Sequence, residues 1–301
     1  MNRPELLAPC GNQKTLKAAV QAGADAVYLG AAKFSARANA GNFIGDELDN
    51  AIKYANSANV KVYLAINTLM TDRELSQALN IVHQAYHAGA AAFILQDLGL
   101  AKLIKQSYPD AVLHASTQMT AHTLNDVNLL GSLGFKRVVL ARELSRVQIK
   151  EIIASTAVEL EVFVHGALCS SYSGQCLMSS FIGGRSANRG KCAQPCRLPY
   201  KAAKKSGVLF SLKDLCLIEY IDELAKIGVS SLKIEGRMKG EDYVRAVVGT
   251  YRTVLDGKPL TDKHKKAMLN VFDRGGYTDG YFTGKKAEMY MERLKNPYGA
   301  K

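Results

Sequence analysis

The sequence lacks the features of a membrane or secreted protein. None of its apolar stretches is long enough to cross a bilayer. The N-terminal segment Met1-Asn2-Arg3-Pro4 leads into the strand-like run Glu5-Leu6-Leu7 and has neither the basic start nor the apolar core of a signal peptide. We therefore expect a cytoplasmic protein with no membrane partner.

Two common hydrolase motifs are also missing. The sequence contains no His-Glu-x-x-His zinc-protease motif and no Gly-x-Ser-x-Gly nucleophile elbow. A peptidase would still need an activated nucleophile beside a base, or a metal-bound water. His165 precedes Cys169 by four residues and could in principle act as its base. A thiolate committed to a metal, however, is not a free nucleophile.

No low-complexity linker divides the chain, whose 301 residues suit either two small domains or one (β/α) barrel of about 250 residues. Short β-rich runs recur, and most precede a helical stretch with apolar residues three and four apart, such as 13–22, 46–56 and 145–154. The predicted strands are 5–8, 26–30, 62–67, 92–96, 113–116, 137–141, 160–165 and 230–235. We predict one (β/α)8 TIM-like barrel over residues 1–301, with a C-terminal extension over 250–301.

This rhythm breaks after the seventh predicted strand, at residues 167–212. The segment is rich in Cys, Gly, Ser and basic residues, and long aperiodic loops in compact domains are usually functional. It holds four of the six cysteines: Cys169, Cys176, Cys192 and Cys196. In a reducing compartment such a group indicates a metal or redox site rather than disulfides. We predict a cysteine-rich, metal-binding insertion.

Thiolates suit tetrahedral zinc or an iron–sulfur cluster, and the spacing favours the cluster. Structural zinc sites usually present two close ligand pairs with about two to four residues between ligands, whereas six residues separate Cys169 from Cys176. We expect an iron–sulfur cluster of the 4Fe-4S type. Cys10, after the first strand, would point toward the barrel mouth, while Cys216 reads as a core residue at the start of a helix. Either is a minor alternative to Cys196 as a ligand.

Polar residues just past the predicted strands should meet at one end of the barrel, where active sites of this fold lie. The set comprises Asn12, Arg37, Asn67, Asp97, Ser116, Gln118, Arg142, Glu143, His165, Lys233, Glu235 and Arg237. From it we assign His165 and Glu235 as candidate catalytic residues. The candidate substrate ligands are Asn67, Gln118, Arg142, Lys233 and Arg237.

The cations of this set suit an anionic ligand. Guanidinium groups bind carboxylates in a bidentate manner, so Arg142 and Arg237 suit a dicarboxylate. In the alternative, Lys233 and Glu235 share one face of a strand because they lie two residues apart, and they neutralise each other inside the barrel. Glu235 would then be structural.

The whole chain also carries excess positive charge, with a net charge of +12 and a pI near 9.3. Lys and Arg opposite phosphates gain affinity through counterion release, so this excess favours a polyanionic partner. Basic runs at 201–205, 263–266 and 285–286 could contact phosphates. The alternative is that the charge serves only solubility.

Several motifs along the chain form a recognisable set. They are Glu161-Val-Phe-Val-His165-Gly166-Ala-Leu-Cys169, Ser173-Gly174-Gln175-Cys176-Leu-Met-Ser179, Asn188-Arg189-Gly190-Lys191-Cys192-Ala193-Gln194-Pro195-Cys196-Arg197, Ser211-Leu-Lys-Asp-Leu-Cys216 and Lys233-Ile-Glu235-Gly236-Arg237-Met238-Lys239. Asp25-Ala-Val-Tyr28-Leu-Gly30 and Arg142-Glu143-Leu144-Ser145 fit the same pattern. With these motifs the sequence resembles the collagenase-like peptidase family of unassigned catalytic type over nearly its whole length.

The resemblance implies a function. The branch to which this chain is most similar makes 5-hydroxyuridine at the wobble position of tRNA, and related members act on ribosomal RNA or, as a heterodimer, on the ubiquinone ring. The resemblance therefore implies an enzyme that hydroxylates tRNA without molecular oxygen as the obvious oxidant and depends on prephenate. It also implies an iron–sulfur cluster on the four cysteines of the insertion. The alternatives are a collagenase-like peptidase, as the family's name suggests, and a non-catalytic subunit of a hydroxylase complex. A partner subunit would be a second family member.

Overall fold

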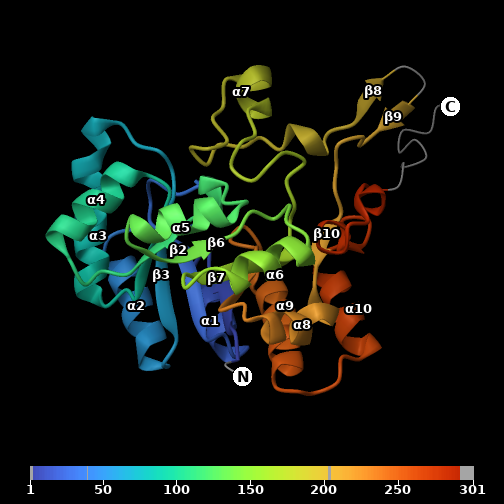
Figure 1. Cartoon of the computed structure of the whole chain (residues 1–301), viewed down its shortest axis with the longest axis horizontal. Coiled ribbons are helices and arrows are strands. Elements are labelled where there is room, and N and C mark those ends of the chain that lie inside the picture. Colours follow the sequence, from blue (N-terminus) through green and yellow to red (C-terminus); the bar gives the residue numbers. More distant parts are fainter. Residues whose placement is uncertain (1–2, 39, 203–204, 292–301) are drawn as a thin grey trace.

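The computed structural model describes residues 3–38, 40–202 and 205–291, and it shows a closed parallel barrel (Figure 1). The barrel strands follow the order β11, β1, β2, β3, β4, β5, β6, β7, and β11 closes the ring by pairing with β7. Their bounds are β1 (Glu5–Pro9), β2 (Ala26–Gly30), β3 (Lys61–Ile66), β4 (Ala92–Leu95), β5 (Leu113–Ala115), β6 (Phe135–Val139), β7 (Glu159–Gly166) and β11 (Ser231–Ile234). Every predicted strand is present, so the predicted (β/α)8 TIM-like fold is confirmed.

Helices between the strands cover the outside of the barrel (Figure 1). They are α1 (Gln13–Gln21), α2 (Asp46–Ser57), α3 (Asp72–Ala88), α4 (Leu98–Ser107), α5 (Leu124–Ser132), α6 (Arg146–Ala154), α8 (Ile221–Ile227) and α9 (Glu241–Leu255). Their ends are encoded locally. Thr71 and Glu74 form a capping box at the start of α3, and Gly89 ends that helix in the left-handed conformation at φ 95°. In the described part of the chain, no helix combines the length and apolarity that crossing a membrane requires.

The barrel interior holds an apolar layer and a charged layer. The apolar layer comprises Leu7, Ala26, Tyr28, Tyr63, Ala65, Ala92 and Ile94. Toward the amino ends of the strands, Arg137 Nη1 lies 2.6 Å from Glu5 Oε1 and 3.5 Å from Glu161 Oε2. Arg137 Nη2 lies 2.9 Å from Glu159 Oε2, and Lys233 Nζ donates to Glu161 Oε1 at 2.7 Å. We call these five charged residues the basal network.

The cysteine-rich segment leaves the end of β7 and returns to the same strand. It contains α7 (Met178–Gly183) and the hairpin of β8 (Tyr200–Ala202) and β9 (Lys205–Gly207), both of which project above the barrel (Figure 1). It then forms β10 (Asp214–Cys216), which pairs antiparallel with the end of β7. The helix predicted at Cys216 is therefore wrong. Helical turns begin only afterwards, at the 3-10 helix Ile218–Tyr220, because Cys216 is held in a strand opposite His165.

The C-terminal extension packs against the barrel. It contains α10 (Asp262–Val271), β12 (Tyr277–Thr278), α11 (Gly280–Thr283) and a 3-10 helix (Lys286–Met289). β12 pairs with β10, and Met268, Phe282 and Met289 are buried in the same core as the barrel helices. The last part of the predicted extension, residues 292–301, lies outside the described residues.

Candidate functional site

A large cavity lies at the carboxyl ends of the barrel strands, under the cysteine-rich segment. Its volume is ≈ 380 Å³, a size suited to a small ligand or cofactor. The predicted site residues that line it are Asn67, Gln118, Arg142, Cys169, Cys176, Cys192, Cys196, Lys233, Glu235 and Arg237. The structure thus brings the predicted metal and substrate ligands to one place, and their roles stay predictions.

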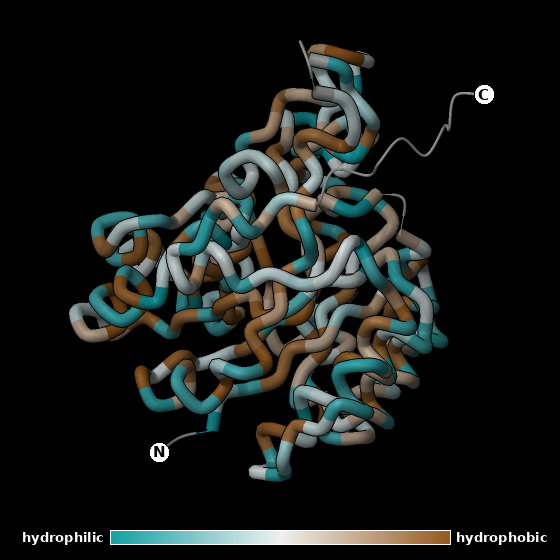
Figure 2. The backbone as a smooth tube through the Cα atoms, turned by 90° about the vertical axis from the view of Figure 1, so that its right-hand side faces the viewer, coloured by the Kyte–Doolittle hydropathy of each residue, from teal (hydrophilic) through white to brown (hydrophobic). Residues whose placement is uncertain are grey.

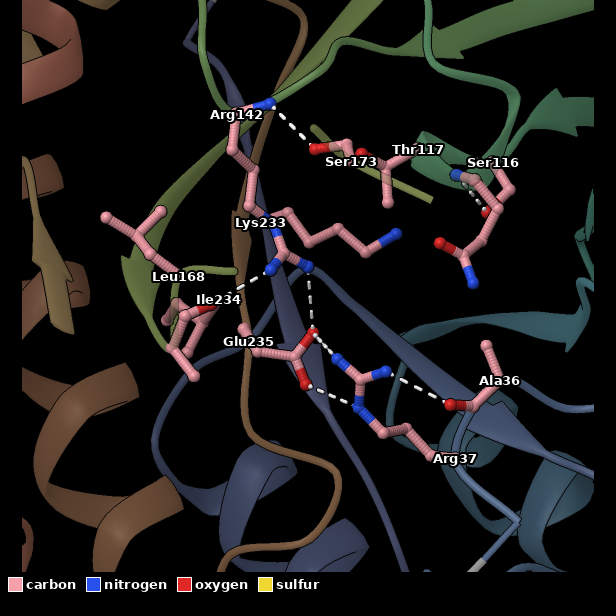
Figure 3. A network of polar contacts seen from close by, with 12 residues as sticks. Ala36, Arg37, Ser116, Thr117, Arg142, Leu168, Ser173, Lys233, Ile234 and Glu235 are labelled. Atoms are coloured by element: carbon pink, nitrogen blue, oxygen red, sulfur yellow. Dashed lines mark hydrogen bonds and ion pairs between the residues drawn. The ribbon is translucent and has the colours of Figure 1, made fainter. Parts of the chain in front are cut away.

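Glu235 lies between two arginines from different elements (Figure 3). Its Oε2 is 3.2 Å from Arg37 Nη2 and 3.3 Å from Arg142 Nη2, and its Oε1 accepts from Arg37 Nε at 3.3 Å. Burial raises the pKa of this carboxyl, but the positive charges of Arg37, Arg142, Arg237 and Lys233 outweigh burial and lower the pKa to about 2. At neutral pH Glu235 is therefore a charged anchor for the two arginines and a poor proton donor.

Lys233 forms its ion pair with Glu161 and not with Glu235. Its ammonium donates to Glu161 in the barrel interior and lies 4.5 Å from the centroid of the Tyr28 ring. The alternative in which Lys233 and Glu235 form a pair is wrong, because β11 ends at Ile234 and Glu235 lies past the regular alternation of the strand. Burial lowers the pKa of Lys233, while Glu161 acts in the opposite direction.

Arg237 is a buried cation without a carboxylate partner among the described residues. Its Nη1 donates to Ser35 Oγ at 2.6 Å, and the side chain lies over the Tyr28 ring. Only 4% of Arg237 is exposed, and this burial lowers its pKa to about 10. A guanidinium in such a position is available to an anionic ligand that enters the cavity.

The four cysteines of the insertion line the cavity from the side of the cysteine-rich segment. Burial raises the pKa of Cys176, and the charges of Cys169, Cys192 and Cys196 act in the same direction. The Ser179 hydroxyl of α7 lies 3.7 Å from Cys192 Sγ and ties that helix to the cysteine wall.

This donor set suits a thiolate-bound metal or cluster by its chemistry. In the observed conformation, however, no three metal-ligating side chains of the described residues are gathered into a ligand group. The iron–sulfur cluster and its zinc alternative both stay predictions.

The two spare thiols do not line the cavity. Cys10 is fully buried with its Sγ 3.8 Å from the Thr15 carbonyl oxygen, so the prediction that it points toward the barrel mouth is wrong. It packs between the end of β1 and α1 instead. Cys216 Sγ lies 3.8 Å from the Tyr251 hydroxyl, on the outer side of the barrel.

His165 also lies away from the cavity. Its Nδ1 is 3.3 Å from the Tyr251 hydroxyl, and its ring packs against Tyr243 and Tyr277. Burial lowers the pKa of His165 to about 3, so the ring is neutral at physiological pH. Its predicted catalytic role stays a prediction, and this position offers no support for it.

Other predicted strand-end residues serve the scaffold. Asn12 caps α1 and Asp97 caps α4 through their side chains, while Glu143 accepts a hydrogen bond from Ser173. Conversely, three cations that line the cavity were not assigned from the sequence: Arg197, Lys239 and Arg274. None of the three directly follows a barrel strand, which is where we looked for site residues. Arg197 follows Cys196 and Lys239 ends the motif that begins at Lys233, so closeness to a motif could have identified these two.

A model of peptidase family U32 matches residues 11–292 of this sequence. The chain belongs to peptidase family U32. Among U32 relatives, the tRNA hydroxylation protein P1 of Bacillus subtilis (strain 168) is 36% identical over 315 residues, which cover 97% of this chain and 75% of that protein. The collagenase of Porphyromonas gingivalis (strain ATCC BAA-308 / W83) is 31% identical over 321 residues, or 97% of this chain and 77% of the relative.

A third U32 relative is much longer than this chain. The 23S rRNA 5-hydroxycytidine synthase of Escherichia coli (strain K12) is 40% identical over 262 residues, which cover 85% of this chain but 40% of that enzyme. The chain therefore spans less than half of that enzyme's length. The solved structure of the U32 peptidase Mk0906 has a TM-score of 0.51 at 13% identity and covers 77% of this chain and 93% of that one. This last likeness concerns the fold alone.

Proposed function

We propose that this chain is an RNA-modifying enzyme that hydroxylates a pyrimidine base. The observation that carries the proposal is that four thiols and an excess of cations line one cavity at the carboxyl ends of the barrel strands. Relatives named as a tRNA hydroxylation protein and as a 5-hydroxycytidine synthase support the same reaction class. In its finer form the proposal is 5-hydroxyuridine at the wobble position of tRNA, made with prephenate and an iron–sulfur cluster, without molecular oxygen, in the cytoplasm.

The residues of this chain would bind and orient the reactants. Arg237 has no carboxylate partner among the described residues, and Arg142 is held in place by Glu235, so both suit the two carboxylates of prephenate. The Asn67 side chain is engaged with Ala36 N and with Ser116 Oγ, and therefore positions the strand ends. Replacing a C–H bond of the base with C–OH is a two-electron oxidation, so the reaction needs a two-electron acceptor and a source of the hydroxyl oxygen besides the residues of this chain. A 4Fe-4S cluster on the four cysteines would carry electrons, one at a time, between the base and that acceptor.

The cavity gives little support to a peptidase. A cysteine peptidase needs a base within hydrogen-bond reach of its thiol, and among the described residues no histidine lines the cavity. The family name and the collagenase relative favour that activity, but no residue arrangement in the cavity does, so peptide hydrolysis is an outcome for the test to detect rather than a second proposal.

The test is mass spectrometry of nucleosides from the tRNA and rRNA of a deletion strain. We expect 5-hydroxyuridine to disappear from tRNA, to return with the wild-type gene, and not to return with Cys192→Ser. Cys216→Ser is the matched control, because Cys216 does not line the cavity, and it should restore the nucleoside. Unchanged nucleosides in both RNA pools, or peptide hydrolysis that Cys192→Ser abolishes, would overturn the proposal.

The metal has its own test. Protein purified without oxygen should be brown, with the broad absorbance near roughly 400 nm expected of cysteine-bound clusters. Cys169→Ala, Cys176→Ala and Cys192→Ala should each remove this absorbance. A colourless protein with stoichiometric zinc would exclude the cluster.

A further inference from the structure

The helix α7 presents apolar side chains to solvent. Phe181 is 86% exposed and Ile182 62% exposed. We call these two residues the α7 knob. Figure 2 shows a hydrophobic stretch at the end of the molecule from which the cysteine-rich segment projects. Large apolar side chains in such an exposed place commonly mark a binding surface.

The inner side of α7 fixes the knob in place. Ser179 is buried, and its hydroxyl accepts from Ala193 N at 3.1 Å and lies beside Cys192 Sγ. Met178 lines the cavity. The helix that carries the knob is therefore fixed beside the proposed active site by the contacts of Ser179 with Cys192 and Ala193.

The segment that carries the knob has charges of one sign in its own sequence, and its Arg189 pairs with Glu74 of α3. Between Glu161 and Asp214 the sequence contains no Asp or Glu. The cations in this stretch are Arg185, Arg189, Lys191, Arg197, Lys201, Lys204, Lys205 and Lys213. Arg185, two residues after the end of α7, and Lys191, beside Cys192, are both exposed.

Exposed apolar side chains in a segment that has basic but no acidic residues suit one class of ligand. Single-stranded nucleic acid offers unpaired bases that stack on aromatic rings and phosphates that neutralise nearby cations. A second protein surface would satisfy the apolar side chains but would also have to supply acidic groups. Duplex RNA would satisfy the cations alone, since its bases are already stacked.

We propose that the α7 knob stacks on an unpaired base of an RNA loop while Arg185 and Lys191 contact the adjoining phosphates. The inference rests on the proposed function, because it names the part of the RNA that the hydroxylase holds. Phe181 lies on the same helix as Met178, which lines the cavity.

The test compares two fluorescein-labelled RNAs, a hairpin with an unpaired loop and a fully paired duplex of equal length, by anisotropy with the full chain. Base–aromatic stacking contributes about 1–3 kcal/mol per base, so Phe181→Ala should weaken hairpin binding about 5- to 150-fold and leave duplex binding unchanged. Phe181→Trp should retain hairpin affinity. Leu129→Ala, at a 60% exposed apolar residue of α5, is the matched control and should change neither RNA.

The salt dependence of RNA affinity distinguishes base stacking from phosphate contacts. For single strands, each lost phosphate contact reduces the slope of log affinity against log salt by about 0.7. Arg185→Gln and Lys191→Gln should each reduce the slope by that amount, whereas Phe181→Ala should reduce the affinity at an unchanged slope.

Three results would overturn the inference: wild-type hairpin affinity in Phe181→Ala, equal weakening of hairpin and duplex, or a dimer that Phe181→Ala converts to monomer with no effect on RNA. Nucleoside analysis of the deletion strain is independent of these affinities. If hairpin binding depends on Phe181 but the nucleosides of the deletion strain are unchanged, the RNA-binding role of the knob stands and the proposed hydroxylase function fails. If the Phe181→Ala variant keeps both hydroxylation and hairpin affinity, the hydroxylase function stands and the RNA-binding role of the knob fails.

Discussion

The two ends of the barrel interior differ in the balance between acidic and basic side chains. In the basal network each carboxylate meets a cation: Arg137 contacts Glu5, Glu159 and Glu161, and Lys233 contacts Glu161. At the cavity, Glu235 is the one carboxylate among the described lining residues. The cations that line the cavity are Arg37, Arg142, Arg197, Lys233, Arg237, Lys239 and Arg274.

This difference separates stability from function. A buried charge is costly unless a partner compensates it, so the matched charges of the basal network serve the fold. Among the lining cations, Arg37 and Arg142 pair with Glu235, Lys233 with Glu161 and Arg274 with Asp214, whereas Arg237 has no carboxylate partner among the described residues. A charge of this kind costs stability and is retained where a ligand supplies the missing negative charge. Four substitutions test this contrast by their effect on the free energy of unfolding.

The largest loss is expected for Glu161→Ala. Glu161 is fully buried, and its removal leaves Lys233 and Arg137 short of a partner in the barrel interior. Breaking a buried pair on one side costs about 3–5 kcal/mol, measurable by urea unfolding. Glu159→Ala is the matched control, because Glu159 binds the same arginine but its side chain is 33% exposed, and it should cost much less. Equal losses would show that burial does not set the cost.

A loss of roughly 3 kcal/mol at neutral pH is expected for Glu235→Gln, from the lowering of its pKa from 4.5 to about 2. The folded protein binds this proton less readily than the unfolded chain does. The stabilisation by Glu235 is therefore present above about pH 4.5 and disappears as the pH falls toward 2. Unfolding curves of wild type and variant should converge over this range. A constant offset between them would mean that the carboxylate is not held by its arginines.

A small loss, below about 1 kcal/mol, is expected for Lys61→Ala. Lys61 Nζ lies 3.1 Å from Glu5 Oε2, but the lysine side chain is 61% exposed at the rim of the basal network. The loss should shrink further at high salt, because exposed pairs are screened. Urea unfolding at two salt concentrations measures both effects, and a large loss that ignores salt would place Lys61 within the buried network.

No loss of stability, or a small gain, is expected for Arg237→Gln. The substitution removes a buried cation that has no carboxylate partner among the described residues. It should nevertheless abolish 5-hydroxyuridine in the complemented deletion strain and leave the cluster absorbance unchanged, and Arg142→Ala should abolish the nucleoside as well. If both variants keep wild-type nucleoside levels, these arginines do not bind substrate, and the site must be sought elsewhere in the cavity.

The barrel itself was predictable because its signals are local. Apolar residues recur with the period of each element, and caps such as Thr71 and Gly89 mark helix ends within a few residues. The cavity was predictable to the extent that strand ends converge by topology, which is how Asn67, Arg142 and Glu235 reach one place.

Side-chain partners were not predictable, because they depend on register between distant strands. Glu161 and Lys233 are 72 positions apart, and only the pairing of β7 with β11 brings them together. The same pair of strands explains His165. Their register shifts by one residue between Lys233 and Ile234, as at a β-bulge, and His165 pairs with Ile234 and turns toward Tyr251 on the outer side.

The return of the chain to β7 also has an evolutionary consequence. Gly166 leaves the barrel and Leu215 comes back opposite it, so the two ends of the cysteine-rich segment are hydrogen-bonded neighbours. At Gly166, φ is 101° and an added Cβ would lie 2.6 Å from the Glu235 carbonyl oxygen, which fixes this exit point. Lengthening a loop whose ends are already joined costs only about 0.6 kcal/mol per doubling. Insertions and deletions within the segment should therefore cost little stability, while the barrel strands on either side keep their register.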